Sequence, residues 1–298
     1  MLQNMQQRGG SDIMLNTIPR IPVGEWVENG IDFLLFYFAD TTRWISSRMN
    51  EVLSGFEEGL LVLHPMLLAA IFAVAAGLST RKRGLAAFVF LSLCLVWNME
   101  LWPAAMSTLT LVSLATILAV TIGVPLGVAA AIYGRLHRFL MPTLDMMQTM
   151  PAFVYLIPAI PFFGLGKVSA LFATMVFATP PAIRFTCLGI RQVPKDLVEC
   201  AESFGATRMQ RLFKLELPMA APSILAGINQ TIMLSLSMVV VAAMIGAKGL
   251  GGEVWRAIQR LNLGSGFEAG LGIVILAICL DRVLQDLVNR LRNKAARS

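Results

Sequence analysis

The sequence predicts an all-α protein whose helices cross a membrane several times. Of its 298 residues, 56% are hydrophobic and only 14% are charged, whereas soluble domains carry about 25% charged residues. The mean hydropathy is +0.70. The apolar runs are continuous and long enough to cross about 30 Å of hydrocarbon, which favours helices over the alternating strands of a β-barrel.

The first 58 residues are expected to form an arm on the membrane surface. Between Trp26 and Phe56, apolar clusters alternate with charged residues, which is typical of one or two amphipathic helices at an interface. An apolar stretch at 31–39 is too short to span the hydrocarbon layer. We therefore expect an arm over residues 1–58 and a transmembrane domain over residues 59–298.

The transmembrane domain contains seven long apolar runs, which predict about seven spans. Their approximate ranges are 60–79, 84–102, 106–133, 146–165, 168–190, 222–246 and 267–287. The last run is expected to continue past Arg282, whose long side chain can reach the interface.

Lysine and arginine are distributed unevenly between the two sets of predicted loops. Sixteen of the 24 lie in residues 80–84, 134–145 and 184–221 and at the C-terminal end, and the others lie on the opposite side. Because cytoplasmic loops are enriched in these residues, the N-terminus is expected outside and the C-terminus in the cytoplasm. The net charge of +6 is explained in the same way, without a nucleic-acid partner.

A polar segment, residues 199–218 (ECAESFGATRMQRLFKLELP), lies between two of the predicted spans. Its six charged side chains would cost about 18 kcal/mol near the centre of a bilayer, at about 3 kcal/mol each. The segment is therefore expected at the cytoplasmic surface.

Local signals around this segment predict two short helices joined by a turn. Asp196 and Glu199 have the spacing of a capping box, and so do Thr207 and Gln210. Gly205, between the two boxes, fits the left-handed position that ends many helices.

Both short helices are predicted to be amphipathic. Their apolar stripes consist of Leu197, Ala201 and Phe204 in the first helix, and of Met209, Leu212, Phe213 and Leu217 in the second. The second helix is expected to end at Pro218, because proline lacks the backbone N–H that continues a helix. The amphipathic pattern alone favours an interfacial loop that has no partner.

The amino-acid sequence of the polar segment resembles the EAA motif in the membrane subunits of ABC importers. That motif reads E-A-A, three residues, G, nine residues, I-x-L-P, and every spacing is matched here. Cys200 replaces an alanine and Leu215 an isoleucine. The resemblance implies a cytoplasmic coupling loop over residues 191–221 that docks on a separate ATPase. The expected coupling residues are Glu199, Ala201, Gly205, Arg208, Arg211, Leu217 and Pro218, although Glu199 could instead serve only as a helix cap.

Three further stretches resemble the membrane subunit of glycine betaine/proline betaine importers. They are LDMMQTMPAFVYLIP (144–158), LFKLELPMAAPSILAGINQTIMLSLSMVVVAAMIGAKGLG (212–251) and GIVILAICLDR (272–282). The resemblance implies a type I ABC importer membrane-domain fold in a bacterial inner membrane. The resemblance further implies substrates that are compact quaternary amines, such as glycine betaine, proline betaine, choline or carnitine. Histidine importers have similar membrane subunits, so an amino-acid substrate is the alternative.

The same resemblance implies the partners of the chain. They are a second copy of itself, two ATPase subunits and an extracytoplasmic substrate-binding protein. ATP and magnesium are expected on the ATPases, with no cofactor or metal in this chain. The run Gly164–Lys167 contains the glycine–lysine pair of a phosphate loop, but Pro161 and Val168 stand where that motif needs glycine and serine or threonine.

Polar and aromatic residues within the predicted spans are candidates for a substrate pathway: Phe153, Tyr155, Asn229, Gln230, Thr231, Met233 and Ser237. Asn229, Met233 and Ser237 have the spacing of one helical face. Phe153 or Tyr155 could contact a quaternary ammonium through a cation–π interaction. The alternatives are hydrogen bonding between helices for the polar residues and simple packing for the aromatic ones.

Two rival functions remain at this point. A secondary transporter would act without an ATPase, but no paired charges are seen at mid-span. An exporter or a scaffold without transport activity is disfavoured by the EAA-like motif, which is a feature of importers.

Overall fold

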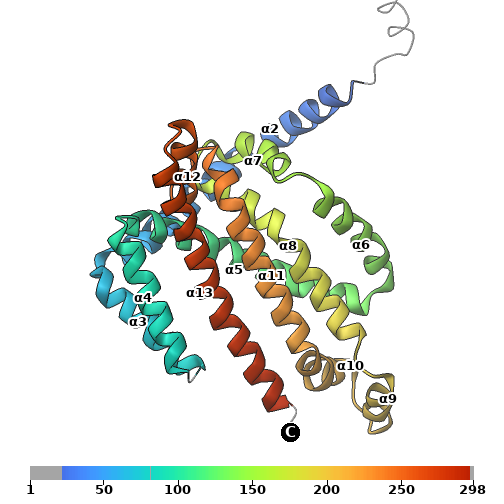
Figure 1. Ribbon diagram of the computed structural model, residues 1–298. Coiled ribbons are helices and arrows are strands. Elements are labelled where there is room, and N and C mark those ends of the chain that lie inside the picture. The colour runs from blue at the N-terminus through green and yellow to red at the C-terminus, as the bar shows by residue number, and fades with distance from the viewer. Residues whose placement is uncertain (1–21, 81, 296–298) are drawn as a thin grey trace, which may run out of the picture. The chain divides into compact units, whose positions relative to one another are not determined.

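The computed structural model describes residues 22–80 and 82–295, and all regular elements in this part of the chain are helical (Figure 1). The prediction of an all-α fold is confirmed. The elements are α2 (Val23–Val62), α3 (Pro65–Thr80), α4 (Arg83–Asn98), α5 (Trp102–Ile132), α6 (Gly134–Thr149), η1 (Ala152–Tyr155), α7 (Leu156–Phe163), α8 (Lys167–Arg191), α9 (Lys195–Ser203), α10 (Arg208–Arg211), η2 (Leu212–Glu216), α11 (Leu217–Ala243), α12 (Leu250–Gln259) and α13 (Leu263–Ala295).

The chain divides into two compact units at Thr41 and Thr42, within α2. The described part of the first unit, residues 22–41, is mainly helix with exposed aromatic side chains, among which the rings of Phe33 and Tyr37 lie 4.8 Å apart. Exposed aromatic residues on an amphipathic helix suit a membrane interface. Residues 1–21 of the expected arm lie outside the described residues.

The remainder of α2, from Thr42 onward, packs on the helical bundle of the second unit. Glu57 forms an ion pair with Lys167 at the start of α8, and both side chains are largely buried. Leu53 is 1% exposed and lies in a cluster with Val168 and Leu171. Residues 42–58, which the sequence placed in the arm, therefore contact the transmembrane helices.

Four helices among the described residues are long and apolar enough to cross a bilayer: Trp102–Ile132, Lys167–Arg191, Arg208–Ala243 and Leu263–Arg282. Two bent pairs raise this number to six if each pair counts as one span. The pairs are Gly24–Val62 with Pro65–Leu78, bent by 100°, and Gly134–Thr149 with Ala152–Phe163, bent by 112°. The helix Arg83–Asn98 is apolar but shorter.

The span predicted over 146–165 is therefore not one continuous helix. The chain breaks at Met150, whose ψ of 135° is extended, and Pro151 follows it. A proline disfavours helical geometry in the residue before it, which explains a break at this position.

Small residues bring α5, α8 and α11 into close contact. A Cβ on Gly123 would stand 2.7 Å from Ala182, and one on Gly127 would stand 2.6 Å from the carbonyl oxygen of Ile183. A Cβ on Gly227 of α11 would stand 2.8 Å from the Cβ of Phe185 on α8. Close backbone approach at small residues is typical of helix packing in membranes.

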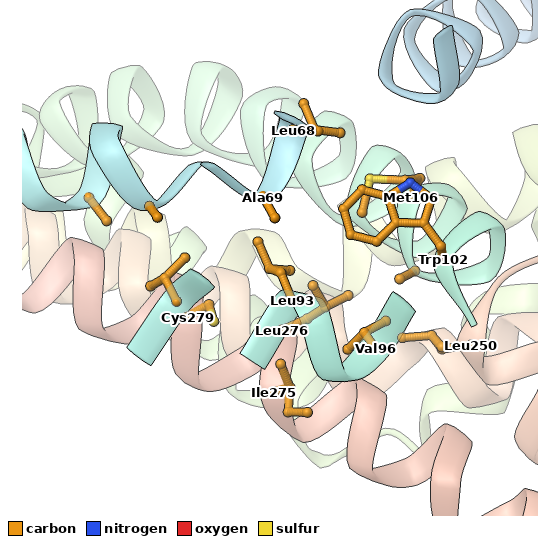
Figure 2. Packing of buried hydrophobic residues seen from close by; sticks show 14 residues of the cluster. Leu68, Ala69, Leu93, Val96, Trp102, Met106, Leu250, Ile275, Leu276 and Cys279 are labelled. Atoms are coloured by element: carbon orange, nitrogen blue, oxygen red, sulfur yellow. The ribbon is translucent and has the colours of Figure 1, made fainter. Parts of the chain in front are cut away.

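A second buried cluster joins α3, α4, α5 and α13. Figure 2 shows Leu93 and Val96 of α4 facing Ile275 and Leu276 of α13, with Leu250 at one end. Val96 and Leu250 are fully buried. This contact extends the α5–α8–α11 core to the outer helices and leaves α9 and α10 at one end of α11 and α12 at the other (Figure 1).

Candidate functional site

The polar segment folds as two short helices around Gly205. This glycine has a φ of +77°, and its N–H donates to the carbonyl oxygen of Glu202. The capping box of α10 is present: the backbone N–H of Gln210 donates to Thr207, and that of Thr207 donates to the Gln210 side chain. Two local predictions, the turn at Gly205 and the second capping box, are thus confirmed.

The first predicted capping box is wrong. Helix α9 begins at Lys195 with Pro194 as its N-cap residue, so Asp196 lies inside the first turn. Glu199 consequently sits in the middle of α9, where its exposed side chain caps nothing. Proline fixes its own φ near the helical value and needs no N–H donor, and so it starts this helix earlier than the acidic residue would.

The prediction that Pro218 ends the second helix is also wrong. The chain remains helical from Arg208 to Ala243 and passes through a π-turn, η2, directly before this proline. The N–H of Leu217 reaches back five residues to the carbonyl oxygen of Leu212. The wider π-turn leaves room for the ring of Pro218, which would otherwise collide with the carbonyl group four residues earlier.

A charged cluster lies inside the segment, centred on Arg211. Its Nη1 forms an ion pair with Glu202 of α9, and its Nε lies 2.8 Å from a carboxylate oxygen of Glu216 at the end of η2. The second contact is an ion pair without hydrogen-bond alignment. The side chain of Glu216 is only 10% exposed, so Arg211 provides the charge that balances a buried carboxylate.

The outer surface of the segment is apolar as well as charged. Phe204 is 88% exposed, Met209 64% and Phe213 60%. A hollow of about 370 Å³ lies beside them and is lined by Ala201, Phe204, Gly205, Ala206, Gln210, Arg211, Lys214 and Leu215. Exposed large side chains grouped beside a hollow are a feature of protein interaction sites.

The structure brings the predicted coupling residues together, but with different environments. Glu199, Gly205, Arg208 and Pro218 are exposed, whereas Ala201, Arg211 and Leu217 are partly buried. Leu217 packs against a small cluster that includes Ile190, Leu212 and Ala220. The exposed residues are available to a partner protein, and the others support the segment from within.

The predicted pathway residues of α11 divide between two sides of the helix. Gln230 and Ser237 are exposed and Met233 is partly exposed, so these three mark one open face. Asn229 instead donates a hydrogen bond of 2.9 Å to Asp281 of α13, and Thr231 is buried and donates to the carbonyl oxygen of Gly227. Asn229 is therefore engaged in a contact between helices, whereas Gln230, Met233 and Ser237 are accessible on one side of α11.

The two aromatic candidates also differ. Tyr155 is 8% exposed, its hydroxyl donates to the carbonyl oxygen of Met147, and its ring lies edge-on to Phe177 at 5.5 Å. Phe153 is 50% exposed. Packing accounts for Tyr155, whereas Phe153 has a surface that a ligand could reach.

Three acidic residues of these sites were not singled out from the sequence: Glu202, Glu216 and Asp281. Glu202 lies nine residues before Arg211, across the turn at Gly205, so no helical spacing connects the two. Asp281 was taken as part of the last span, where an ionisable residue is itself a signal of a buried polar contact.

Comparisons with known proteins support the family resemblance. Residues 123–293 match the family described as binding-protein-dependent transport system inner membrane component. The chain is 46% identical to the glycine betaine transport system permease protein OpuAB of Bacillus subtilis, over 92% of this chain and 96% of the relative. It is 44% identical to the glycine betaine/carnitine transport permease protein GbuB of Listeria monocytogenes, over 94% and 99%. It is also 44% identical to the glycine betaine/proline betaine transport system permease protein ProW of Escherichia coli, over 93% and 78%.

The fold is similar to that of a solved structure of the MetNI methionine ABC transporter in an inward-facing conformation. The TM-score is 0.59 with 22% sequence identity, covering 63% of this chain and 94% of that chain. This similarity concerns the fold, an ABC importer membrane domain.

Proposed function

Because the chain belongs to the family of binding-protein-dependent transport system inner membrane components, we propose that it is the permease subunit of an ATP-driven importer. The substrate is glycine betaine, proline betaine or a similar quaternary amine. The names of relatives support this class: glycine betaine, carnitine, proline betaine and trimethylamine N-oxide occur in them. The histidine alternative has no support among these relatives.

The observation that carries the proposal is the polar segment itself. It combines the EAA-like spacing with a folded helix pair, an exposed apolar surface and a hollow of about 370 Å³. This surface suits docking on an ATPase subunit, with Glu199 and Arg208 facing the partner.

The assembly that follows contains two copies of this chain, two ATPase subunits and one extracytoplasmic binding protein. The chain provides one membrane domain, and importers of this fold enclose the pathway between two. Gln230 and Ser237 on the open face of α11 are suited to line that pathway. The N-terminus faces outside and the C-terminus faces the cytoplasm of a bacterial inner membrane.

ATP hydrolysis is assigned to the partner subunits. In a phosphate loop, a glycine-rich turn follows a strand and cradles the phosphates. Here the residues before Gly164 belong to α7, and Pro161 and Val168 replace required residues of the motif. The chain thus contributes coupling and a pathway, and the cofactors ATP and magnesium bind elsewhere.

The mechanism transfers motion from the ATPases to the pathway. Closure of the ATPase pair displaces α9 and α10. Helix α11 continues from α10 through η2 for 27 residues, about 40 Å. Movement at the docking end therefore reaches the open face of α11 through a continuous helix, which can change the access of the pathway from one side to the other.

The test is reconstitution of the chain with its ATPase and its binding protein in vesicles. We expect uptake of radiolabelled glycine betaine that requires internal ATP and both partners, and stabilisation of the binding protein by a betaine in a thermal-shift assay. Uptake by the chain alone, driven by an ion gradient, would identify a secondary transporter. Stabilisation of the binding protein by histidine and by no quaternary amine would overturn the substrate class.

A further inference from the structure

We propose that Arg211 is a positioning residue, which fixes the orientation of the helix pair α9–α10 on the base of α11. The inference rests on the proposed function, since it takes the polar segment as the docking site of the ATPase. It gives two of the three basic residues of that segment different roles: Arg208 faces the partner, and Arg211 transmits the motion.

The contacts of Arg211 join three consecutive parts of the segment. The residue itself ends α10, its Nη1 contacts Glu202 of α9, and its Nε contacts Glu216 at the end of η2. A guanidinium spreads its charge over three nitrogen atoms and can therefore lie against two carboxylates at once, here by a hydrogen bond to Glu202 and by an ion pair without hydrogen-bond alignment to Glu216. One side chain therefore connects the docking helix to the start of α11.

The second contact depends on the π-turn. In a regular α-helix, residues five positions apart, such as Arg211 and Glu216, point about 140° away from each other around the axis. The π-turn closes hydrogen bonds over five residues, as between Leu217 and Leu212, and so brings such positions onto one side. The ion pair and the π-turn consequently stabilise each other.

Burial makes this connection costly to break. The side chain of Arg211 is 25% exposed and that of Glu216 is 10% exposed. Removing one partner of a buried ion pair leaves an uncompensated charge, which favours rearrangement of the surrounding chain. Loss of Arg211 is thus expected to free α9 and η2 from each other, while the exposed side chains of Phe204, Arg208 and Met209 are all still present for the partner.

Arg208 provides a matched comparison within the same turn of helix. It is exposed and contacts no acidic group in the described part of the chain. Arg208→Ala should therefore weaken binding of the ATPase, whereas Arg211→Ala should leave the ATPase bound but reduce the amount of substrate imported per ATP hydrolysed.

The experiment measures three quantities in vesicles that contain the full transporter: ATPase co-purification, substrate-stimulated ATP hydrolysis and uptake. For Arg211→Ala we expect normal co-purification and a fall of about tenfold in uptake per ATP, the fold-change that corresponds to a coupling energy of about 1.4 kcal/mol between residues in contact. An unchanged ratio, or a loss of the ATPase equal to that in Arg208→Ala, would overturn the proposal.

A double-mutant cycle separates positioning from a general loss of stability. If Arg211 acts through Glu216, then Arg211→Gln together with Glu216→Gln should lose no more coupling than Arg211→Gln alone, because Arg211→Gln already removes the contact with Glu216. Additive losses contradict the proposal. If Arg211→Ala does not accumulate in the membrane, Arg211→Lys replaces it and should retain part of the coupling, because the charge remains but is no longer spread over three nitrogen atoms.

A distance measurement tests the same inference without transport. Spin labels on Cys200, which is exposed on α9, and on Ala226→Cys, exposed on α11, report the orientation of the helix pair in a Cys94→Ser background. Arg211→Gln should broaden the distance distribution, and an unchanged distribution would refute the role. Failure of the unaltered chain to import any substrate would instead reject the proposed function, whatever the spin labels show.

Discussion

At the scale of single residues, a glycine at position 205 could be required by its own backbone conformation or by the space that a docked partner needs. Its φ of +77° lies in the left-handed region, yet a Cβ there meets no atom of the described chain within 4 Å. The glycine is therefore required within this chain by its backbone conformation, and any steric need for it comes from a docked partner.

Gly205→Ala should weaken the turn by about 1–2 kcal/mol, because an L-residue in the left-handed region brings its Cβ near the next carbonyl oxygen. A cost of this size lowers the ratio of folded to unfolded turn by a factor of about 5 to 30. We expect a fall in ATP-driven uptake, measured in vesicles with equal amounts of transporter. The control is Gly134→Ala, where the φ is ordinary and a Cβ also meets nothing. Equal uptake by both variants would contradict the prediction.

Residue-level predictions from the sequence were accurate where the signal was local. The turn at Gly205 and the capping box of Thr207 and Gln210 depend on neighbouring residues, and both are confirmed. The contact between Arg211 and Glu216 could not be predicted, because it exists only in a π-turn that the sequence pattern does not reveal.

At the scale of elements, the packing of α5 on α8 depends on glycine. Gly127 of α5 stands so close to Ile183 that a Cβ would lie 2.6 Å from a backbone oxygen. A backbone atom cannot move aside as a flexible side chain can, so the two helices would have to separate.

Gly127→Ala should therefore destabilise the bundle by about 1–3 kcal/mol, the usual cost of overpacking. Thermal unfolding in detergent, followed by the loss of monodisperse protein, measures the effect. Gly270→Ala on α13 is the matched control, since a Cβ there meets nothing within 4 Å. A melting temperature equal to that of the control would show that α5 and α8 adjust without cost.

Two prolines explain which element boundaries the sequence could and could not predict. The apolar runs predicted the long helices, but not α12 and not most of α6, which lie in segments predicted as loops. Pro151 breaks a predicted span, and Pro218 fails to end a predicted helix. Whether a proline breaks the helix depends on the backbone before it. Met150 is extended, and the helix ends there, whereas η2 is a widened turn, and the helix continues through it. Such geometry is set by the surrounding packing and is not encoded by the proline alone.

At the scale of the whole molecule, the proposed orientation places the polar segment in the cytoplasm. Cys200 offers a native probe, because it is exposed on α9, whereas Cys94 is partly buried and Cys187 and Cys279 are buried. A thiol reagent that cannot cross the membrane will therefore react mainly with Cys200.

We expect a membrane-impermeant maleimide to label the chain in inverted vesicles but not in intact spheroplasts. Cys200→Ser should abolish the labelling, and bound ATPase should reduce it if α9 lies in the interface. Gel shift or mass spectrometry measures the modification. Labelling of Cys200 from the outside of spheroplasts would reverse the proposed topology.

The π-turn at Leu212–Glu216 also determines the rotational phase between the two ends of the molecule. It inserts one residue into an otherwise continuous helix, and one residue of an α-helix corresponds to about 100° of rotation and 1.5 Å of rise. If the same residues closed as a regular α-helix, the extra residue would turn the docking surface by about 100° around the α11 axis, and Arg211 would point away from Glu216. The conformation of residues 212–216 is therefore as much a part of the interface as the side chains that these residues carry.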